Sequence, residues 1–182
     1  ATDFALREYR PLIQTAVFRL LSVAPSRDLY NFSDCGTSPG PNGDMTMAWF
    51  AAQTRNSDYF ERDRFLHNPD SMGTLPRYAG AGLAWIMDFE NRTRDGAVHP
   101  ALPLNWKGDG PTPVVFFRGG TQDPHQFYLG AKGGTGIHSH GNLDAGSFVF
   151  ELNGVRWVVD PGTQDYYDVE KTGFDLWGMC QT

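Results

Sequence analysis

The chain has 182 residues, 40% of them hydrophobic and 14% aromatic, which suffices for one domain, or parts of two, with a substantial core. Its net charge of −6 lacks the basic footprint of nucleic-acid-binding proteins, and no apolar run approaches the ~20 residues of a membrane span. We therefore expect no nucleic-acid and no membrane partner. The two cysteines, Cys35 and Cys180, are too few for a disulfide framework.

The first half of the chain carries apolar residues at helical spacing. Helices are predicted over residues 3–23, 43–55, 57–68 and 76–89. Between the first two lies a long Pro- and Gly-rich loop, residues 24–43. Loops of this length often carry function, but nothing in the sequence assigns a role to its polar residues Asn31 and Asp34.

Strand patterns replace helical ones near residue 95. Residues 112–120 and 125–134 are short apolar runs bounded by glycine, and a hairpin over residues 147–160 follows them. Helices followed by strands indicate an α+β protein, with a helical region at 1–95 and an antiparallel β-sheet domain at 96–182. The sheet has about four predicted strands when the sequence stops. We therefore expect an incomplete sheet domain whose partner is the remainder of a parent chain.

Asn153-Gly154 is the preferred pair for a two-residue type I′ turn. With this turn, Glu151 faces Arg156 as a cross-strand ion pair, and Phe150 faces Trp157. At the open end of the hairpin, Ser147 faces Asp160.

The hairpin has one wholly apolar face, which we predict to be core. It consists of Phe148, Phe150, Leu152, Val155, Trp157 and Val159. The opposite face carries Ser147, Val149, Glu151, Arg156, Val158 and Asp160. Asp160 ends this face where a polar loop with His138, His140, Asn142 and Asp144 enters, so the turn brings two polar clusters together.

The stretch "HGNLDAGSFVFELNGVRWVVDPG", residues 140–162, resembles the sheet-domain signature of the heparinase II/III-like polysaccharide lyases. Members show His-x-His-x-Asp-x-Gly-Ser-Phe, a strand, a turn with Gly, a second strand and Asp-x-Gly. Weaker similarity extends over residues 28–182. The resemblance implies the C-terminal part of an (α/α) toroid followed by the beginning of an antiparallel β-sandwich.

The family's reaction is β-elimination at a uronic acid of an acidic polysaccharide, of the glycosaminoglycan or alginate type. The substrate carboxylate must be neutralised, a base must remove the C5 proton, and an acid must protonate the leaving oxygen. The family draws an Asn or His and a Tyr from the toroid, which we expect before residue 1, so this chain alone is expected to be catalytically incomplete. The resemblance also implies a periplasmic or secreted protein.

The resemblance assigns site residues when Gly146-Ser147-Phe148 is taken as the anchor. His140 then takes the position of the catalytic histidine, and Asn142 and Asp160 take those of metal ligands. An alternative alignment uses His138 and His140 as the histidine pair. Because Asn is a poor zinc ligand, zinc, calcium and no metal all stay open. Tyr166 and Tyr167 are predicted to bind substrate by stacking on sugar rings.

Two other functions stay open. A non-catalytic glycan-binding or structural module is favoured by Asn142 and by the missing toroid residues. A cupin-like metal enzyme is favoured by two histidines and a carboxylate beside a hairpin. A local basic groove for an anionic ligand is also open, and its candidate residues are Lys107, Arg118, Lys132 and Arg156.

Overall fold

The computed structural model describes residues 4–33, 35–38, 45–59, 79–120, 122–134, 144–161 and 165–173. The chain divides into two compact units. The helical unit comprises Ala1–Leu20 and Gly40–Leu102, and the sheet unit comprises Leu21–Pro39 and Pro103–Thr182. Residues 21–39, although they follow a helix, therefore belong with the sheet.

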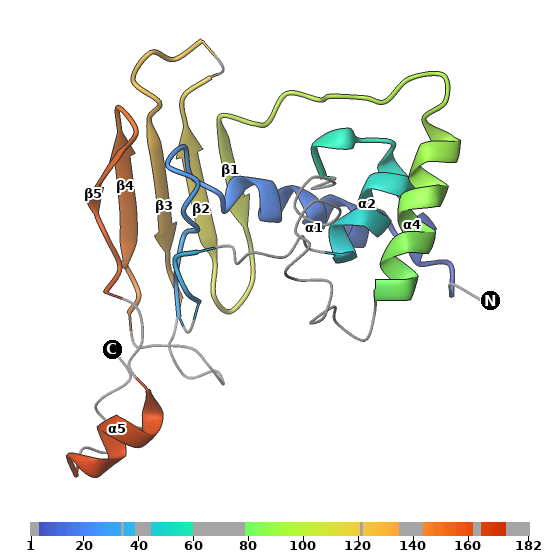
Figure 1. Ribbon diagram of the computed structural model, residues 1–182. Helices are drawn as coiled ribbons and strands as arrows, with labels where there is room; N and C mark the ends of the chain where they lie inside the picture. Colours follow the sequence, from blue (N-terminus) through green and yellow to red (C-terminus); the bar gives the residue numbers. More distant parts are fainter. Residues whose placement is uncertain are drawn as a thin grey trace, which may run out of the picture. The chain divides into compact units, whose positions relative to one another are not determined.

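The described part of the helical unit contains three α-helices and two 3-10 helices (Figure 1). They are η1 (Leu6–Glu8), α1 (Arg10–Leu21, whose last residue falls in the sheet unit), α2 (Met45–Thr54), η2 (Ser57–Tyr59) and α4 (Ala79–Arg92). Three of the four predicted helices are confirmed. α1 is shorter than predicted, whereas α4 continues to Arg92, past its predicted end at residue 89. Of the predicted helix at 57–68, only η2 lies within the described residues.

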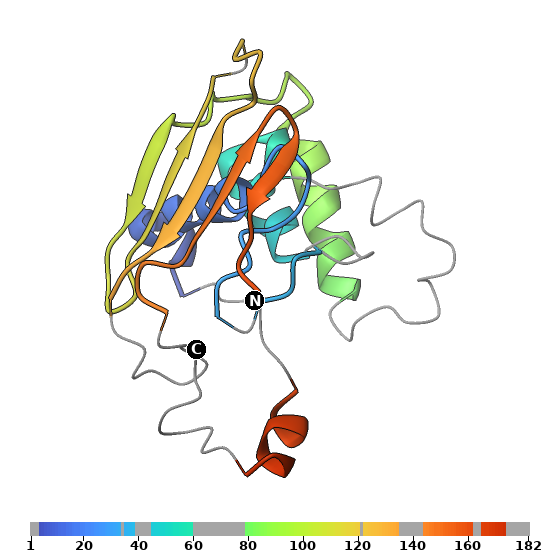
Figure 2. The ribbon, with the colours of Figure 1, turned by 90° about the vertical axis from the view of Figure 1, so that its left-hand side faces the viewer.

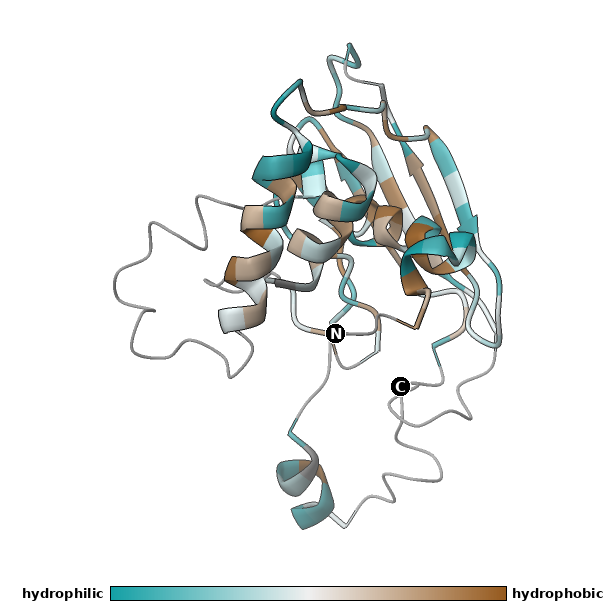
Figure 3. Ribbon diagram, turned by 90° about the vertical axis from the view of Figure 1, so that its right-hand side faces the viewer, coloured by the Kyte–Doolittle hydropathy of each residue, from teal (hydrophilic) through white to brown (hydrophobic). Residues whose placement is uncertain are grey.

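The core of the helical unit is built on small side chains of α2. Ala51 and Ala52 are fully buried, which lets neighbouring elements approach this helix closely. The cluster joins Ala16, Met47, Phe50, Ala51, Ala52, Tyr59 and Phe89. Figure 3 shows that apolar and polar bands alternate on α4, as expected for a helix with one buried face. None of the helices in the described part of the chain is long and apolar enough to cross a membrane.

The sheet unit contains a five-stranded antiparallel sheet in the order β1-β2-β3-β4-β5 (Figure 2). Its elements are β1 (Asn105–Gly108), β2 (Val114–Arg118), β3 (Tyr128–Lys132), β4 (Phe148–Leu152), β5 (Val155–Val158) and the helix α5 (Tyr166–Lys171). Helices together with an antiparallel sheet confirm the α+β class. The sequence missed β1 and α5, because each is too short to set up a clear period.

The hairpin of β4 and β5 turns as predicted. Asn153 and Gly154 have φ of 55° and 73°, the positive values of a type I′ turn, and Glu151 pairs with Arg156. The register then shifts, so that Phe150 pairs with Val158. The predicted pairing of Phe150 with Trp157 is therefore wrong, because a bulge inserts an extra residue in β5.

The predicted core face of the hairpin is also wrong. Val149 and Glu151 are both 0% exposed, whereas Trp157 is 65% exposed. The buried, inner face of the sheet is therefore the one that carries the ion pair. The apolar residues Phe148, Val155, Trp157 and Val159 lie exposed on the opposite, outer face.

The polar face of the hairpin is buried because a stretch of chain covers the inner face of the sheet. Residues 21–33, here called the crossing segment, place the ring of Tyr30 edge-on to Phe116 of β2, with centroids 5.8 Å apart. Gly130 of β3 leaves the room, since a Cβ there would lie 3.0 Å from Cγ of Tyr30 and 3.2 Å from Cε1 of Phe116. The crossing segment therefore fills the place of a core layer.

Replacing Gly130 with Ala should destabilise the sheet unit by about 1–3 kcal/mol, because the buried rings must move to admit a methyl group. The measurement is urea denaturation followed by circular dichroism. Gly36→Ala is the matched control, since a Cβ at Gly36 meets nothing within 4 Å. Equal stability of the two variants would contradict the close packing of Tyr30 on β3.

Candidate functional site

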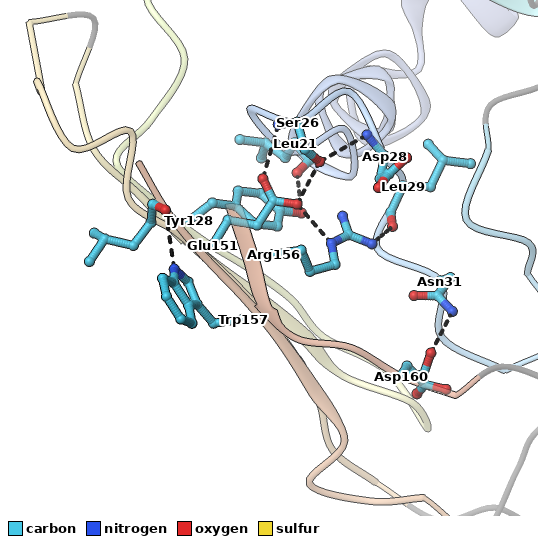
Figure 4. Close-up of polar contacts among 11 residues, drawn as sticks. Leu21, Ser26, Asp28, Leu29, Asn31, Tyr128, Glu151, Arg156, Trp157 and Asp160 are labelled. Atoms are coloured by element: carbon cyan, nitrogen blue, oxygen red, sulfur yellow. Dashed lines mark hydrogen bonds and ion pairs between the residues drawn. The ribbon is translucent and has the colours of Figure 1, made fainter. Parts of the chain in front are cut away.

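A buried ion pair holds the crossing segment against the inner face (Figure 4). Nε of Arg156 donates to Oε1 of Glu151 at 2.7 Å, and both side chains are buried. Ser26 completes the carboxylate's partners, with its main-chain N–H 3.0 Å from Oε2 and its hydroxyl 2.7 Å from Oε1. Glu151 thus has three charge-assisted hydrogen bonds, as a fully buried carboxylate requires.

A tight turn presents Ser26 to the carboxylate. The main chains of Ala24 and Asp28 are joined by a 2.9 Å hydrogen bond, and Val23 and Leu29 form an antiparallel bridge. Arg27 adopts a positive φ of 74°, a conformation that non-glycine residues enter mainly in turns. The polar turn within the predicted long loop is therefore a docked element of the sheet unit.

Other strands hold the rest of the crossing segment. Nη1 of Arg156 donates to the carbonyl of Leu29 at 2.9 Å, and the hydroxyl of Tyr128 donates to the carbonyl of Leu21 at 2.8 Å. Nδ2 of Asn31 donates to the carbonyl of Asp160 at 3.1 Å (Figure 4). These bonds satisfy buried main-chain groups that would otherwise destabilise the fold, and they bring Asn31 to the open end of the hairpin.

A second group of polar residues meets at that open end. We call it the polar cluster, and it consists of Tyr30, Asn31, Ser33, Lys132, Asp144, Ser147 and Asp160. Its members come from the crossing segment, from the end of β3 and from the two ends of the hairpin. Residues distant in sequence are therefore joined at one place, as predicted for Asp144 and Asp160.

Ser147 lies at the centre of the polar cluster. Its hydroxyl donates to Oδ2 of Asp160, and its main-chain N–H donates to the carbonyl of Asp144 at 2.8 Å. Its carbonyl accepts from the hydroxyl of Tyr30 at 3.2 Å and from the main-chain N–H of Lys132 at 2.9 Å. The predicted meeting of Ser147 with Asp160 is confirmed.

Lys132 is the buried cation of the cluster. Nζ donates to Oγ of Ser33 at 3.0 Å and to Oδ1 of Asp144, and the side chains of Lys132 and Asp144 are 2% and 13% exposed. Lys132 and Arg156 are thus each paired with a buried carboxylate. They do not form the open basic groove for which they were candidates.

Tyr30 serves the cluster as a neutral donor. Burial raises the pKa of its hydroxyl well above the usual 10.0, and the negative charges of Asp160 and then Asp144 raise it further. A phenol with a raised pKa stays protonated at neutral pH, and this one already donates to Ser147. Tyr30 therefore orders the site and does not act as a base.

The predicted site residues lie in different parts of the chain, and the structure describes only some of them. His138, His140 and Asn142 lie outside the described residues. Asp160 lies in the polar cluster, half-buried. Tyr166 and Tyr167 begin α5, and the ring of Tyr167 is exposed under Nζ of Lys171, 4.0 Å from its centroid. Their role in substrate binding stays a prediction.

A metal was predicted at Asn142 and Asp160. Among the described residues, no three His, Cys, Asp or Glu side chains come together as a metal site requires. The neighbouring carboxylate of Asp144 is bound by the ammonium of Lys132, which disfavours a second cation at that oxygen. The described residues alone therefore do not make a zinc site, and the metal stays a prediction.

Tyr30 and Ser33 were not among the site residues expected from the sequence, and Lys132 was expected only as part of a basic groove. Tyr30 and Ser33 lie in a loop that has no period, and their contacts reach across more than 90 positions in the chain. Lys132 offered one signal, a lone lysine at the end of an apolar strand before two glycines. A charged strand residue on the buried face needs an oppositely charged or hydrogen-bonding partner, because burying an unpaired charge costs free energy.

Comparison with known proteins agrees with the motif found in the sequence. The family model described as heparinase II/III-like, C-terminal, matches residues 126–176. The match spans β3, β4, β5 and α5, together with Lys132, Asp144, Ser147 and Asp160. No curated protein matches the chain.

Replacing Arg156 with Met should destabilise the sheet unit by about 3–5 kcal/mol, because Glu151 stays behind as a buried charge without its cation. Urea denaturation measures this loss. The control is Arg92→Met, which breaks an exposed 2.9 Å pair with Asp88 and should cost less than about 1 kcal/mol. Similar losses in the two variants would contradict the role of Glu151 and Arg156 in holding the crossing segment.

The buried tyrosines predict alkaline instability. Burial raises the pKa of both Tyr30 and Tyr128, so these phenols stay neutral in the folded chain and ionise only after unfolding. Their contribution to the free energy of unfolding is fully present below the usual pKa of 10.0 and is lost as the pH rises above this value. A Tyr30→Phe/Tyr128→Phe variant should lose less stability over this pH range than the wild type.

Denaturation midpoints measured at increasing pH test this expectation. Tyr167→Phe is the control, because its ring is 65% exposed. If the double variant and the control lose the same stability at alkaline pH, ionisation of Tyr30 and Tyr128 does not cause the loss.

Proposed function

We propose that the chain is part of a polysaccharide lyase, because residues 126–176 match the heparinase II/III-like family model. The substrate class is a uronic-acid-containing glycan, cleaved by β-elimination. The family match over the hairpin is the observation that carries this proposal. The polar cluster supports it, because ordered polar side chains converge where the family motif lies.

In this proposal His140 assists proton transfer at the sugar ring. It lies in the segment 135–143, which begins three residues after Lys132 and ends just before Asp144. Lys132, Asp144 and Ser147 are joined to one another by hydrogen bonds, so both flanks of this segment belong to one ordered cluster. A proton-transfer group needs such support to stay within reach of the reacting carbon.

Neutralisation of the substrate carboxylate is assigned to residues outside this chain. Lys132 and Arg156 are each engaged with a buried carboxylate, so their charges are already balanced. An Asn or His and a Tyr from a preceding helical toroid would supply neutralisation and the second proton transfer, as the family implies. A metal at Asn142 and Asp160 and a periplasmic or secreted location are also proposals.

The outer face of the sheet supports the proposed β-sandwich. Its exposed apolar residues include Phe117, Phe148, Val155, Trp157 and Val159. An apolar sheet face of this kind is normally covered by a second layer. In the proposed fold that layer is the second sheet of the sandwich, contributed by the remainder of the parent chain.

A non-catalytic glycan-binding module is the second candidate, supported by Asn142 at a position where the family motif has histidine. The cupin-like alternative has less support. The described strands form an open sheet with β1 and β5 at its edges, whereas a cupin needs a closed barrel.

The lyase proposal predicts an increase in ultraviolet absorbance, because β-elimination leaves a double bond conjugated with the uronate carboxylate. Heparan sulfate, hyaluronan, chondroitin and alginate are incubated with the 182-residue chain and with a longer protein that contains it. His140→Ala should abolish the increase by removing the proton-transfer group. His125→Ala is the matched control, since its ring bonds Asn153 at the other end of the hairpin.

An increase in absorbance that persists in His140→Ala would contradict the assigned role of His140. Retained glycan binding without unsaturated product would favour the binding module. Activity of the longer protein alone would agree with toroid residues being required.

A further inference from the structure

The buried pair of Lys132 and Asp144 closes a loop in the chain. The two residues are 12 positions apart, and the segment 135–143 with His140 lies between them. Main-chain bonds reinforce the closure, since the N–H of Gly146 donates to the carbonyl of Lys132 at 2.7 Å. The side-chain ion pair and the strand ladder therefore fix the same loop base.

Structural needs alone do not explain this pair. A buried ion pair stabilises a fold only when its remaining polar atoms are also satisfied. Oδ2 of Asp144 is buried and has no hydrogen-bond partner in the described part of the chain. Glu151, the other buried carboxylate of the inner face, has partners on both oxygens, although Nη2 of Arg156, its cation, has none in the described part of the chain. An arrangement that gives up stability in this way is typical of functional sites.

Ser33 supplies a second observation. It holds Nζ of Lys132 at 3.0 Å while its own backbone has a φ of 54°, in the left-handed region. Non-glycine residues keep this conformation where surrounding contacts enforce it, often beside functional groups. Lys132 thus links the crossing segment to the loop base through two polar side chains.

We propose that Lys132 is a positioning residue of the lyase site. Its ammonium fixes Asp144 against Ser33 and so sets the base of the segment that carries His140. This inference rests on the proposed function for its catalytic consequence. The anchoring itself is described by Ser33, Lys132, Asp144 and the hydrogen-bonded main chain.

The test separates positioning from stability with two variants in the longer, active protein. Lys132→Met leaves the Asp144 charge buried, so it should lower both the melting temperature and kcat. Lys132→Met/Asp144→Leu replaces both charges with apolar groups and should recover the melting temperature. Its kcat should stay lower than that of the wild type by about 10- to 100-fold, the usual effect of losing a supporting side chain at a reaction site.

KM should change little in both variants, because Lys132 does not touch the substrate. Lys132→Arg, which keeps a cation at the loop base, should restore part of kcat. A double variant with the kcat of the wild type would overturn the proposal. An effect confined to KM would overturn it as well.

Hydrogen exchange tests the anchor without any activity. The amides of Gly146 and Ser147 should exchange faster in Lys132→Met than in Tyr128→Phe, which removes a hydrogen bond at the other end of β3. Equal exchange in the two variants would overturn the anchoring role. When the wild type cleaves no glycan but exchange responds as expected, the proposed function fails and the anchor stands.

Discussion

The sheet unit depends on burying Glu151 and Arg156 on its inner face. A charged pair in that position needs hydrogen-bond partners, and the crossing segment supplies several of them through Ser26 and Leu29. The same requirement fixes the segment in place, because its main-chain groups have few other partners once they are buried. One pair of charges thus decides which face of the sheet is inside and which part of the chain covers it.

The position of the polar cluster follows from this arrangement. The crossing segment runs from the turn at Ser26 to Ser33, so it delivers Tyr30 and Asn31 to the open end of the hairpin. There a second buried ion pair forms between Lys132 and Asp144, as Arg156 and Glu151 form the first. Lys132 and Arg156 thus each balance a carboxylate on the inner face.

The outer face has the opposite character. Phe148, Val155, Trp157 and Val159 are the residues that hydrophobicity alone would place in a core, yet they are exposed here. The crossing segment occupies the inner face. The outer face carries an apolar surface of the kind that packs against a second layer in β-sandwiches. The two faces of the sheet therefore differ: the inner face packs against the crossing segment, and the outer face is exposed.

Local features of the fold could be predicted from the sequence alone. Asn153-Gly154 specified the turn, helical spacing specified α1, α2 and α4, and a contiguous motif indicated the family over the hairpin. These features depend on neighbouring residues, so the sequence contains their cause. It also placed Asp160 near Ser147 at the open end of the hairpin, and their side chains meet there although a bulge shifts the register of the strands.

Three features could not be predicted and became visible only in the folded chain. They are the burial of the polar face, the bulge in β5 and the meeting of Tyr30, Ser33 and Lys132. A two-residue period shows that the strands have two different faces, but which face is buried depends on what covers it. That cover is a loop more than 80 positions away along the chain from the strands it contacts. No local pattern encodes such a contact, since it arises only when buried charges and main-chain groups find one another in the folded chain.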